Sequence, residues 1–322
     1  MNDYELLERT RGIIAPLVTW LDANGDVDTG SMCQHVEYVL KNGCTGGVFI
    51  LGSTGEGPYI AIEEKRSVMH EIVNCVKGRV PVIAGIAAHG VRSALELAHV
   101  AKMEGVDAVM VIVPQYFDLK PADVEIYYRK LAIGLKKEIP IFMYYAPTIT
   151  TSHPKISPEL VFRLAKDKVI CGIKATVMEW EYIADLKRLL KSDYTASCNV
   201  WCGTDVVLID CLKNGVLDFD GVIASAANMF PDFYNVLINA FKEKPRNEPK
   251  CNGLEKINGI IRQMFSVEKA EIPALVKYAL HCANLPFAKN VGVSPPLPSL
   301  GPEGRDHVLT CIKQLKAKGI TF

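Results

Sequence analysis

The chain has 322 residues, about twice the length of a typical single domain, so one large domain with an appendage and two medium domains are both allowed. Nearly half of the residues (49%) are apolar, which excludes a disordered chain and a small disulfide scaffold. Lysine plus arginine and aspartate plus glutamate each number 36, so no net charge draws the protein toward nucleic acid or an anionic membrane.

The first residues are charged and lack the apolar stretch of a secretory signal, and no uncharged apolar segment approaches the roughly 18 residues of a membrane span. We therefore expect a cytoplasmic protein. The ten cysteines are dispersed, without the paired spacing of a zinc site. We interpret them as small buried hydrophobic side chains in a reducing compartment.

Short runs rich in β-branched residues alternate along the chain with longer segments of helical period. This alternation is typical of parallel strands joined by crossover helices. The sequence predicts eight strands, at residues 12–18, 46–51, 80–85, 107–113, 139–144, 169–174, 196–202 and 219–225. Helices are predicted between them, for example at 93–104, 121–136 and 178–191.

Eight repeats of one βα unit fit a closed (β/α)8 TIM barrel better than an open dinucleotide-binding sheet of about six strands. The turn after the first strand also lacks the GxGxxG fingerprint of such a sheet. The alternation stops after Phe241, and helical segments follow at 252–265, 269–283 and 305–318. We predict an α/β fold with a barrel domain over 1–243 and a C-terminal helical region over 244–322.

In such a barrel, functional side chains lie where the strands end. The run 52–57, Gly-Ser-Thr-Gly-Glu-Gly, directly follows the second predicted strand. Its glycines allow a tight turn that exposes backbone N–H groups, and Ser53 and Thr54 add hydroxyls, a combination suited to a carboxylate or phosphate. An ordinary polar turn is the alternative interpretation.

Lys174 ends the otherwise uncharged sixth strand. Strand alternation places Ile170, Gly172 and Lys174 on one face, and the glycine is expected to leave room for a ligand beside the lysine. Burial disfavours the ammonium form, and a neutral amine is a nucleophile toward ketones. A lysine that reaches solvent or pairs with an acid is the alternative.

Tyr144 ends the fifth strand, 30 residues before Lys174, which places both side chains at the same height on adjacent strands. A phenol for acid–base chemistry would then lie beside an imine-forming amine. Tyr116, which follows the fourth strand, adds a hydroxyl at the same rim. The alternative for Tyr144 is a core aromatic residue.

Three motifs therefore follow one another along the chain, each at the end of a predicted strand: 52–57, Tyr144 and Lys174. With them, the chain resembles the superfamily of dihydrodipicolinate synthase and N-acetylneuraminate lyase over nearly its whole length. Residues 52–56 resemble the family's substrate-carboxylate loop, 144–147 its Tyr-Asn-x-Pro segment, and 172–174 the strand that bears the imine lysine. The later segments 203–205 and 221–225, and Asn228 and Pro231, also match.

The resemblance implies a class I mechanism on pyruvate or a related 2-keto acid, without metal or organic cofactor. Lys174 would form the imine, and Tyr144 would carry the proton through Ser53 or Thr54. Tyr116 would complete this relay from a neighbouring subunit of a homotetramer built from two tight dimers. The implied substrate-binding residues are Thr54, Thr176, Gly203, Asp205 and Ser225.

Departures from the family pattern bear on the aldehyde partner. The synthase has an arginine for the carboxylate of aspartate semialdehyde where this chain has Ile149, which cannot make that contact. The sialic-acid lyases have an acid where Val206 stands, and Tyr145 replaces the usual asparagine. We therefore expect aldol cleavage or condensation of pyruvate with an uncharged aldehyde, as in 2-keto-3-deoxy sugar acid aldolases, and keep the synthase reaction as the alternative.

Other activities remain open at this point. Keto-acid dehydratases and deaminases share the imine step. A barrel alone does not guarantee chemistry, so the chain could instead be a keto-acid-binding sensor. A metal-dependent aldolase is disfavoured because the seven histidines are dispersed and no HExxH motif is present.

Overall fold

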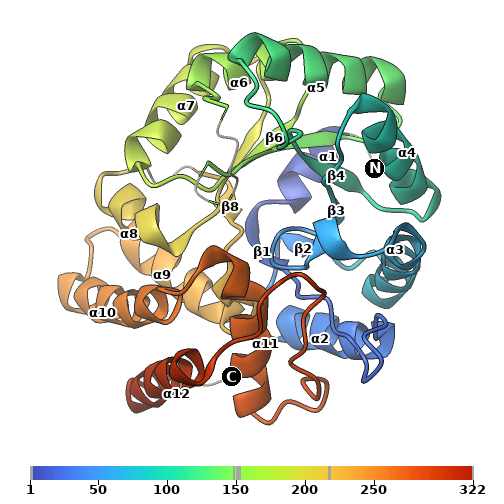
Figure 1. Ribbon diagram of the computed structural model, residues 1–322. Helices are drawn as coiled ribbons and strands as arrows, with labels where there is room; N and C mark the ends of the chain where they lie inside the picture. Colours follow the sequence, from blue (N-terminus) through green and yellow to red (C-terminus); the bar gives the residue numbers. More distant parts are fainter. Residues whose placement is uncertain (1–2, 148, 150–153, 217–218, 321–322) are drawn as a thin grey trace.

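A closed barrel of eight parallel strands forms the centre of the protein in the computed structural model, which describes residues 3–147, 149, 154–216 and 219–320 (Figure 1). Each strand pairs with the strands before and after it in the chain, and β1 pairs with β8 to close the barrel. The strands are β1 (Gly12–Pro16), β2 (Gly47–Ile50), β3 (Val82–Ile86), β4 (Ala108–Ile112), β5 (Ile141–Tyr145), β6 (Gly172–Ala175), β7 (Asn199–Cys202) and β8 (Gly221–Val222). Every predicted strand range contains or overlaps one of them, so the barrel prediction is confirmed.

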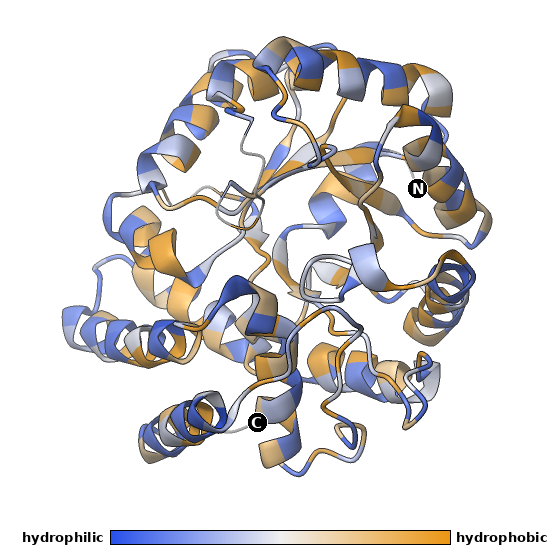
Figure 2. Ribbon diagram, viewed as in Figure 1, coloured by the Kyte–Doolittle hydropathy of each residue, from blue (hydrophilic) through white to orange (hydrophobic). Residues whose placement is uncertain are grey.

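Helices surround the barrel as a ring (Figure 1). Those that follow the strands are α2 (Thr29–Lys41), α3 (Ile62–Val76), α4 (Val91–Met103), α5 (Pro121–Leu135), α6 (Pro158–Lys166), α7 (Trp180–Ser192), α8 (Asp205–Lys213) and α9 (Pro231–Lys242). Short 3-10 turns add η1 (Gly57–Tyr59) after β2 and η2 (Ser225–Asn228) after β8. Apolar residues colour the strands and one face of most helices, because each helix packs only that face on the barrel (Figure 2).

Two apolar layers hold this arrangement together. One lies between the strands and the helices. The other fills the barrel interior, where Phe142 and Trp201 pack with ring centroids 4.8 Å apart. Helix α1 (Asp3–Arg9) closes the end of the barrel at which the strands begin, since its Leu6 and Leu7 join the interior layer. The Trp201 indole N–H donates to the carbonyl of Thr10, just after this helix, at 2.8 Å.

The C-terminal helices pack along one side of the ring (Figure 1). They are α10 (Glu248–Met264), α11 (Ile272–Cys282) and α12 (Pro302–Ala317), with the turn η3 (Lys269–Glu271) before α11. Helix α10 contacts α8 and α9, whereas α11 contacts η2, next to the carboxyl end of β8. The appended helices therefore reach the functional end of the barrel. The domain boundary at 243/244 stays a prediction.

The interpretation of all ten cysteines as reduced is wrong for one pair. Cys33 of α2 and Cys75 of α3 form a disulfide, with Cα atoms 5.8 Å apart. The two helices are neighbours in the ring, and a spacing of 42 residues gives no signal for such a pair. The eight others are free, and six of them are buried as expected.

Within the part of the chain that the structure describes, we find no helix that is both long and apolar enough to span a membrane.

Candidate active site

Lys174 lies at the carboxyl end of β6 with its side chain inside the barrel, only 4% exposed. The register pairs it with Tyr144 of β5, as the spacing of 30 residues predicts. Its Nζ atom lies 4.4 Å from the centroid of the Tyr144 ring and 5.2 Å from that of Phe49. Because Lys174 is buried, its amine does not reach solvent. In the described residues it also forms no ion pair with an acid.

Gly172 has a different role from the one expected. A Cβ atom at this position would lie 2.5 Å from the Trp201 ring and 2.8 Å from that of Phe142. The space beside Gly172 is therefore filled by these two aromatic rings, which form the floor beneath Lys174. The prediction that this glycine leaves room for a ligand is wrong, because the neighbouring strands supply larger side chains than the alternation in β6 alone reveals.

The loop after β2 turns sharply at Leu51, whose φ of 57° is rare for a residue with a branched side chain. Its carbonyl oxygen is enclosed by Gly57 and Gly85, where an added Cβ atom would lie 1.9 Å and 2.2 Å from it. Only glycine fits at these two positions. The turn brings the Ser53 hydroxyl to 3.4 Å from the Tyr144 hydroxyl. Within the described residues, the backbone N–H groups of Ser53 and Thr54 donate to no backbone carbonyl.

Thr54 connects this loop to the segment after β8, the strand on the other side of β1. Its hydroxyl lies 2.9 Å from that of Ser225, in η2 after β8. Asn228 fixes that turn, because its amide donates to the carbonyls of Ser225 and Pro16 at 2.9 and 2.8 Å. Ser53, Thr54 and Ser225 therefore form a hydroxyl-lined arc near Lys174, with donors for a carboxylate.

A buried ion pair supports the same loop from the C-terminal helices. Glu56 and Lys277 of α11 are both fully buried, and their charged groups lie 2.6 Å apart. The Glu56 carboxylate also accepts from the N–H of Ser294, and the Lys277 ammonium donates to the carbonyl of Gly292. Burial lowers the pKa of Lys277, which the Glu56 carboxylate opposes. Sequence reasoning did not find this pair.

The far wall of the cavity is polar. Thr176, Gly203 and Asp205 line it together with Lys174 and Ser225, so the predicted substrate-binding residues come together. Gly203 lies so close to Thr176 that an added Cβ atom would be 2.3 Å from its hydroxyl oxygen. The Asp205 carboxylate accepts from the hydroxyl of Tyr234 in α9, a partner that sequence reasoning missed. Burial raises the pKa of Asp205 to about 6, although this hydrogen bond opposes the rise.

Tyr116 is the one predicted catalytic residue that the chain does not bring to the cavity. Its side chain is 83% exposed and packs edge to face on Phe117. A contribution from a second subunit therefore stays a prediction.

Tyr145 points away from the cavity and packs on Tyr182 of α7, so its departure from the family pattern concerns the packing behind β5.

The outer part of the cavity is lined by Ile149 and Val206, the two departures from the family pattern noted in the sequence. Arg262 of α10 and Lys269 of η3 line it too, and sequence reasoning missed these two. A second, more apolar chamber adjoins it at Ser53 and Tyr144, and Ile149 and Lys269 line both chambers. No sequence motif marks these cations, because they come from the helices after the barrel. In the described chain, no three His, Cys, Asp or Glu side chains gather as metal ligands would.

Comparison with known proteins agrees with this geometry. The model of the "Dihydrodipicolinate synthetase family" matches residues 9–315. The probable 2-dehydro-3-deoxy-D-pentonate aldolase YjhH of Escherichia coli is 28% identical over 98% of this chain and 99% of its own length. A 4-hydroxy-tetrahydrodipicolinate synthase of Alcanivorax borkumensis is 33% identical over 84% of this chain and 86% of its own.

Solved structures have the same fold. The crystal structure of YagE from Escherichia coli, a member of the dihydrodipicolinic acid synthase family in complex with pyruvate, superposes with a TM-score of 0.84. It is 27% identical, and the match covers 95% of this chain and 98% of that one. The match of the family model over nearly the whole length, together with the barrel and its buried strand-end lysine, shows that this chain belongs to the dihydrodipicolinate synthetase family.

Proposed function

We propose that the protein is a class I, Schiff-base carbon–carbon lyase that cleaves or forms the bond between a 2-keto acid such as pyruvate and an aldehyde. The observation that carries this function is the buried Lys174 amine, which has no acidic partner in the described chain and lies beside the Tyr144 phenol. The names of YjhH and YagE, as aldolases of 2-dehydro-3-deoxy acids, support the same class of reaction.

The keto acid would enter with its carboxylate toward the loop after β2. Backbone N–H groups of Ser53 and Thr54 would hold that carboxylate, with Ser225 fixing the Thr54 hydroxyl. This places the ketone carbon near the Lys174 amine. The amine adds to the carbonyl, and the carbinolamine loses water to give a protonated imine.

The imine then acts as an electron sink. Cleavage of the C–C bond beta to it releases the aldehyde and leaves an enamine, and condensation is the reverse step. Tyr144 would take the proton from the hydroxyl at which the aldehyde forms and return it in condensation, with Ser53 as its relay at 3.4 Å. Hydrolysis of the imine frees the keto acid and the lysine. Tyr116 of a second subunit would complete the relay in a homotetramer.

Reductive trapping tests this function. Borohydride added in the presence of pyruvate should leave a reduced pyruvate adduct on Lys174, located by peptide mass. Tight binding of the keto acid without an adduct would instead favour a sensor. Activity that a chelator removes would favour a metal-dependent aldolase.

The synthase reaction is the second candidate, because several relatives that are 30–34% identical have that name. Ile149 lines the cavity where the synthase is expected to have its arginine, so this position offers no contact to the carboxylate of aspartate semialdehyde. A screen of pyruvate with assorted aldehydes, including aspartate semialdehyde, would separate the candidates by product mass.

A further inference from the structure

The outer wall of the cavity has an excess of positive charge. Arg262 and Lys269 line it, whereas Asp205 is its only acidic lining residue in the described chain. Lys174 is reserved for the imine in the proposed function. Two cations are therefore left over at the end of the cavity where the aldehyde portion of the substrate must lie.

Among the residues that the structure describes, these cations have no anionic side chain as a partner. In the described chain, neither Arg262 nor Lys269 forms an ion pair or a side-chain hydrogen bond, although many other surface cations do so. The Arg262 charge acts on the cavity, since it lowers the pKa of Asp205 against the larger effect of burial. Asp205 itself is held by the Tyr234 hydroxyl.

The surrounding residues leave few other uses for this charge. Val206, Phe265 and Ile272 line the same cavity and offer no hydrogen bond. Thr176, Thr204 and Asp205 are left to bind hydroxyls of the substrate, and none of them uses the two cations. A tail that ends in a carboxylate or phosphate would satisfy the two cations, because charge-assisted hydrogen bonds to a guanidinium are stronger than neutral ones.

From this arrangement we infer that the aldehyde portion of the substrate carries a carboxylate or phosphate at the end away from the reacting carbon, and that Arg262 and Lys269 bind it. This inference rests on the proposed function, and it replaces the uncharged aldehyde expected from Ile149 alone. Ile149, on the barrel side of the cavity, carries no positive charge. The positive charges of the cavity come instead from Arg262 in α10 and Lys269 in η3.

Two keto acids of equal length provide a test that does not require the natural aldehyde. 2-Oxoadipate ends in a carboxylate and 2-oxohexanoate ends in a methyl group. We expect borohydride trapping on Lys174 to half-saturate at about tenfold lower 2-oxoadipate than 2-oxohexanoate. The double variant Arg262→Gln/Lys269→Gln should lose this preference, because its half-saturation for 2-oxoadipate rises to that for 2-oxohexanoate.

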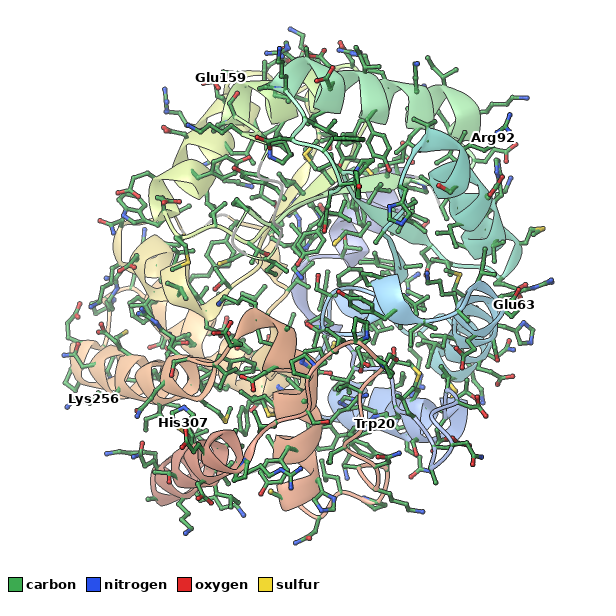
Figure 3. The ribbon with its side chains drawn as sticks, viewed as in Figure 1. Trp20, Glu63, Arg92, Glu159, Lys256 and His307 are labelled. Carbon is green, nitrogen blue, oxygen red and sulfur yellow. A yellow bond between two sulfur atoms is a disulfide. The ribbon has the colours of Figure 1, made fainter. Side chains whose placement is uncertain are left out.

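Lys256→Gln is the matched control. Lys256 lies on the outer side of α10 and points away from the barrel, so its loss should leave both keto acids unchanged (Figure 3). Equal half-saturation of 2-oxoadipate and 2-oxohexanoate, or an equal loss for both in the double variant, would overturn the inference while a pyruvate adduct still upheld the proposed function. Absence of any pyruvate adduct would refute both.

A second arm identifies the anion. With pyruvate as donor, kcat/KM is compared for glyceraldehyde, glyceraldehyde 3-phosphate and succinic semialdehyde. Preference for the phosphate over glyceraldehyde identifies a phosphorylated tail, and preference for the semialdehyde identifies a carboxylate. Fastest turnover of neutral glyceraldehyde, unchanged in the double variant, would contradict the inference.

Discussion

The inner and outer halves of the cavity are built in different ways. The inner half comes from strand ends whose register fixes Tyr144 beside Lys174, and from a loop clamped between Gly57 and Gly85. The outer half comes from loops and from the helices after the barrel, which contribute Arg262 and Lys269. The keto-acid end contains the motifs by which the sequence resembles the family, whereas Ile149 and Val206 at the aldehyde end depart from the pattern expected from that resemblance. We propose that the strand ends determine the reaction type and that the surrounding loops and helices determine the choice of aldehyde.

The strongest test of the inner half is Lys174→Ala. We expect loss of the reduced pyruvate adduct and of turnover, because no other described lysine lines the inner part of the cavity. Intact-protein mass after borohydride treatment measures the adduct, and a thermal melt confirms that the variant folds. Aldol activity that survives in a folded Lys174→Ala protein would refute the assignment.

Tyr144→Phe should separate binding from proton transfer. The phenyl ring keeps the packing against Phe49, while the hydroxyl that faces Ser53 is lost. We expect slow adduct formation to persist and turnover to fall by about 10²–10⁴-fold. Steady-state kinetics and single-turnover trapping on the same sample measure the two steps, and unchanged turnover would move the proton-transfer role to another group.

Lys277→Met tests the link between the C-terminal helices and the inner half. It leaves the Glu56 carboxylate buried without its partner, which costs about 3–5 kcal/mol for such a pair. Urea unfolding should show this loss, and the KM for pyruvate should rise because the loop that we propose to bind its carboxylate is loosened.

The double variant Glu56→Gln/Lys277→Met is the control for that experiment. It removes both charges, so it should recover part of the stability that the single variant loses. A single variant within about 1 kcal/mol of the unaltered protein would mean that the buried pair does not hold the loop.

Asp205 gives the smallest effect and a pH signature at the outer half. Its pKa of about 6 means that kcat/KM for a hydroxylated aldehyde should rise by several-fold between pH 5 and 7, because hydrogen bonds to the ionised carboxylate are stronger than those to the neutral acid. Asp205→Asn should abolish this rise. An aldehyde without hydroxyls serves as the control, and a rise that persists in Asp205→Asn would assign it to another group.

The same pKa determines how Asp205 affects stability. The folded protein holds this proton up to about pH 6, whereas the unfolded chain releases it near 3.8. The folded state therefore binds more protons between these values, and the contribution of Asp205 to stability falls as pH rises through that window and is constant above it. Urea unfolding of the unaltered protein and Asp205→Asn at pH 4 and pH 7 measures the difference.

The two halves also differ in how far the sequence predicts them. Strand periodicity and a spacing of 30 residues were enough to place Tyr144 beside Lys174, because parallel register is regular. The Gly172 interpretation was wrong, since a single strand does not reveal that Trp201 fills the space next to it. Neither Glu56–Lys277 nor the position of Arg262 was predictable, because each joins the barrel to helices whose docking no local pattern records.

The enclosed carbonyl of Leu51 has a consequence for how such an enzyme could acquire a new substrate. Even one methyl group at Gly57 or Gly85 would force that peptide to rotate, and the Ser53 turn would rotate with it. Random mutagenesis should therefore find almost no active clone altered at either glycine. Adaptation to a different aldehyde would have to begin at the opposite wall, where side chains project from helices and exchange without moving the backbone.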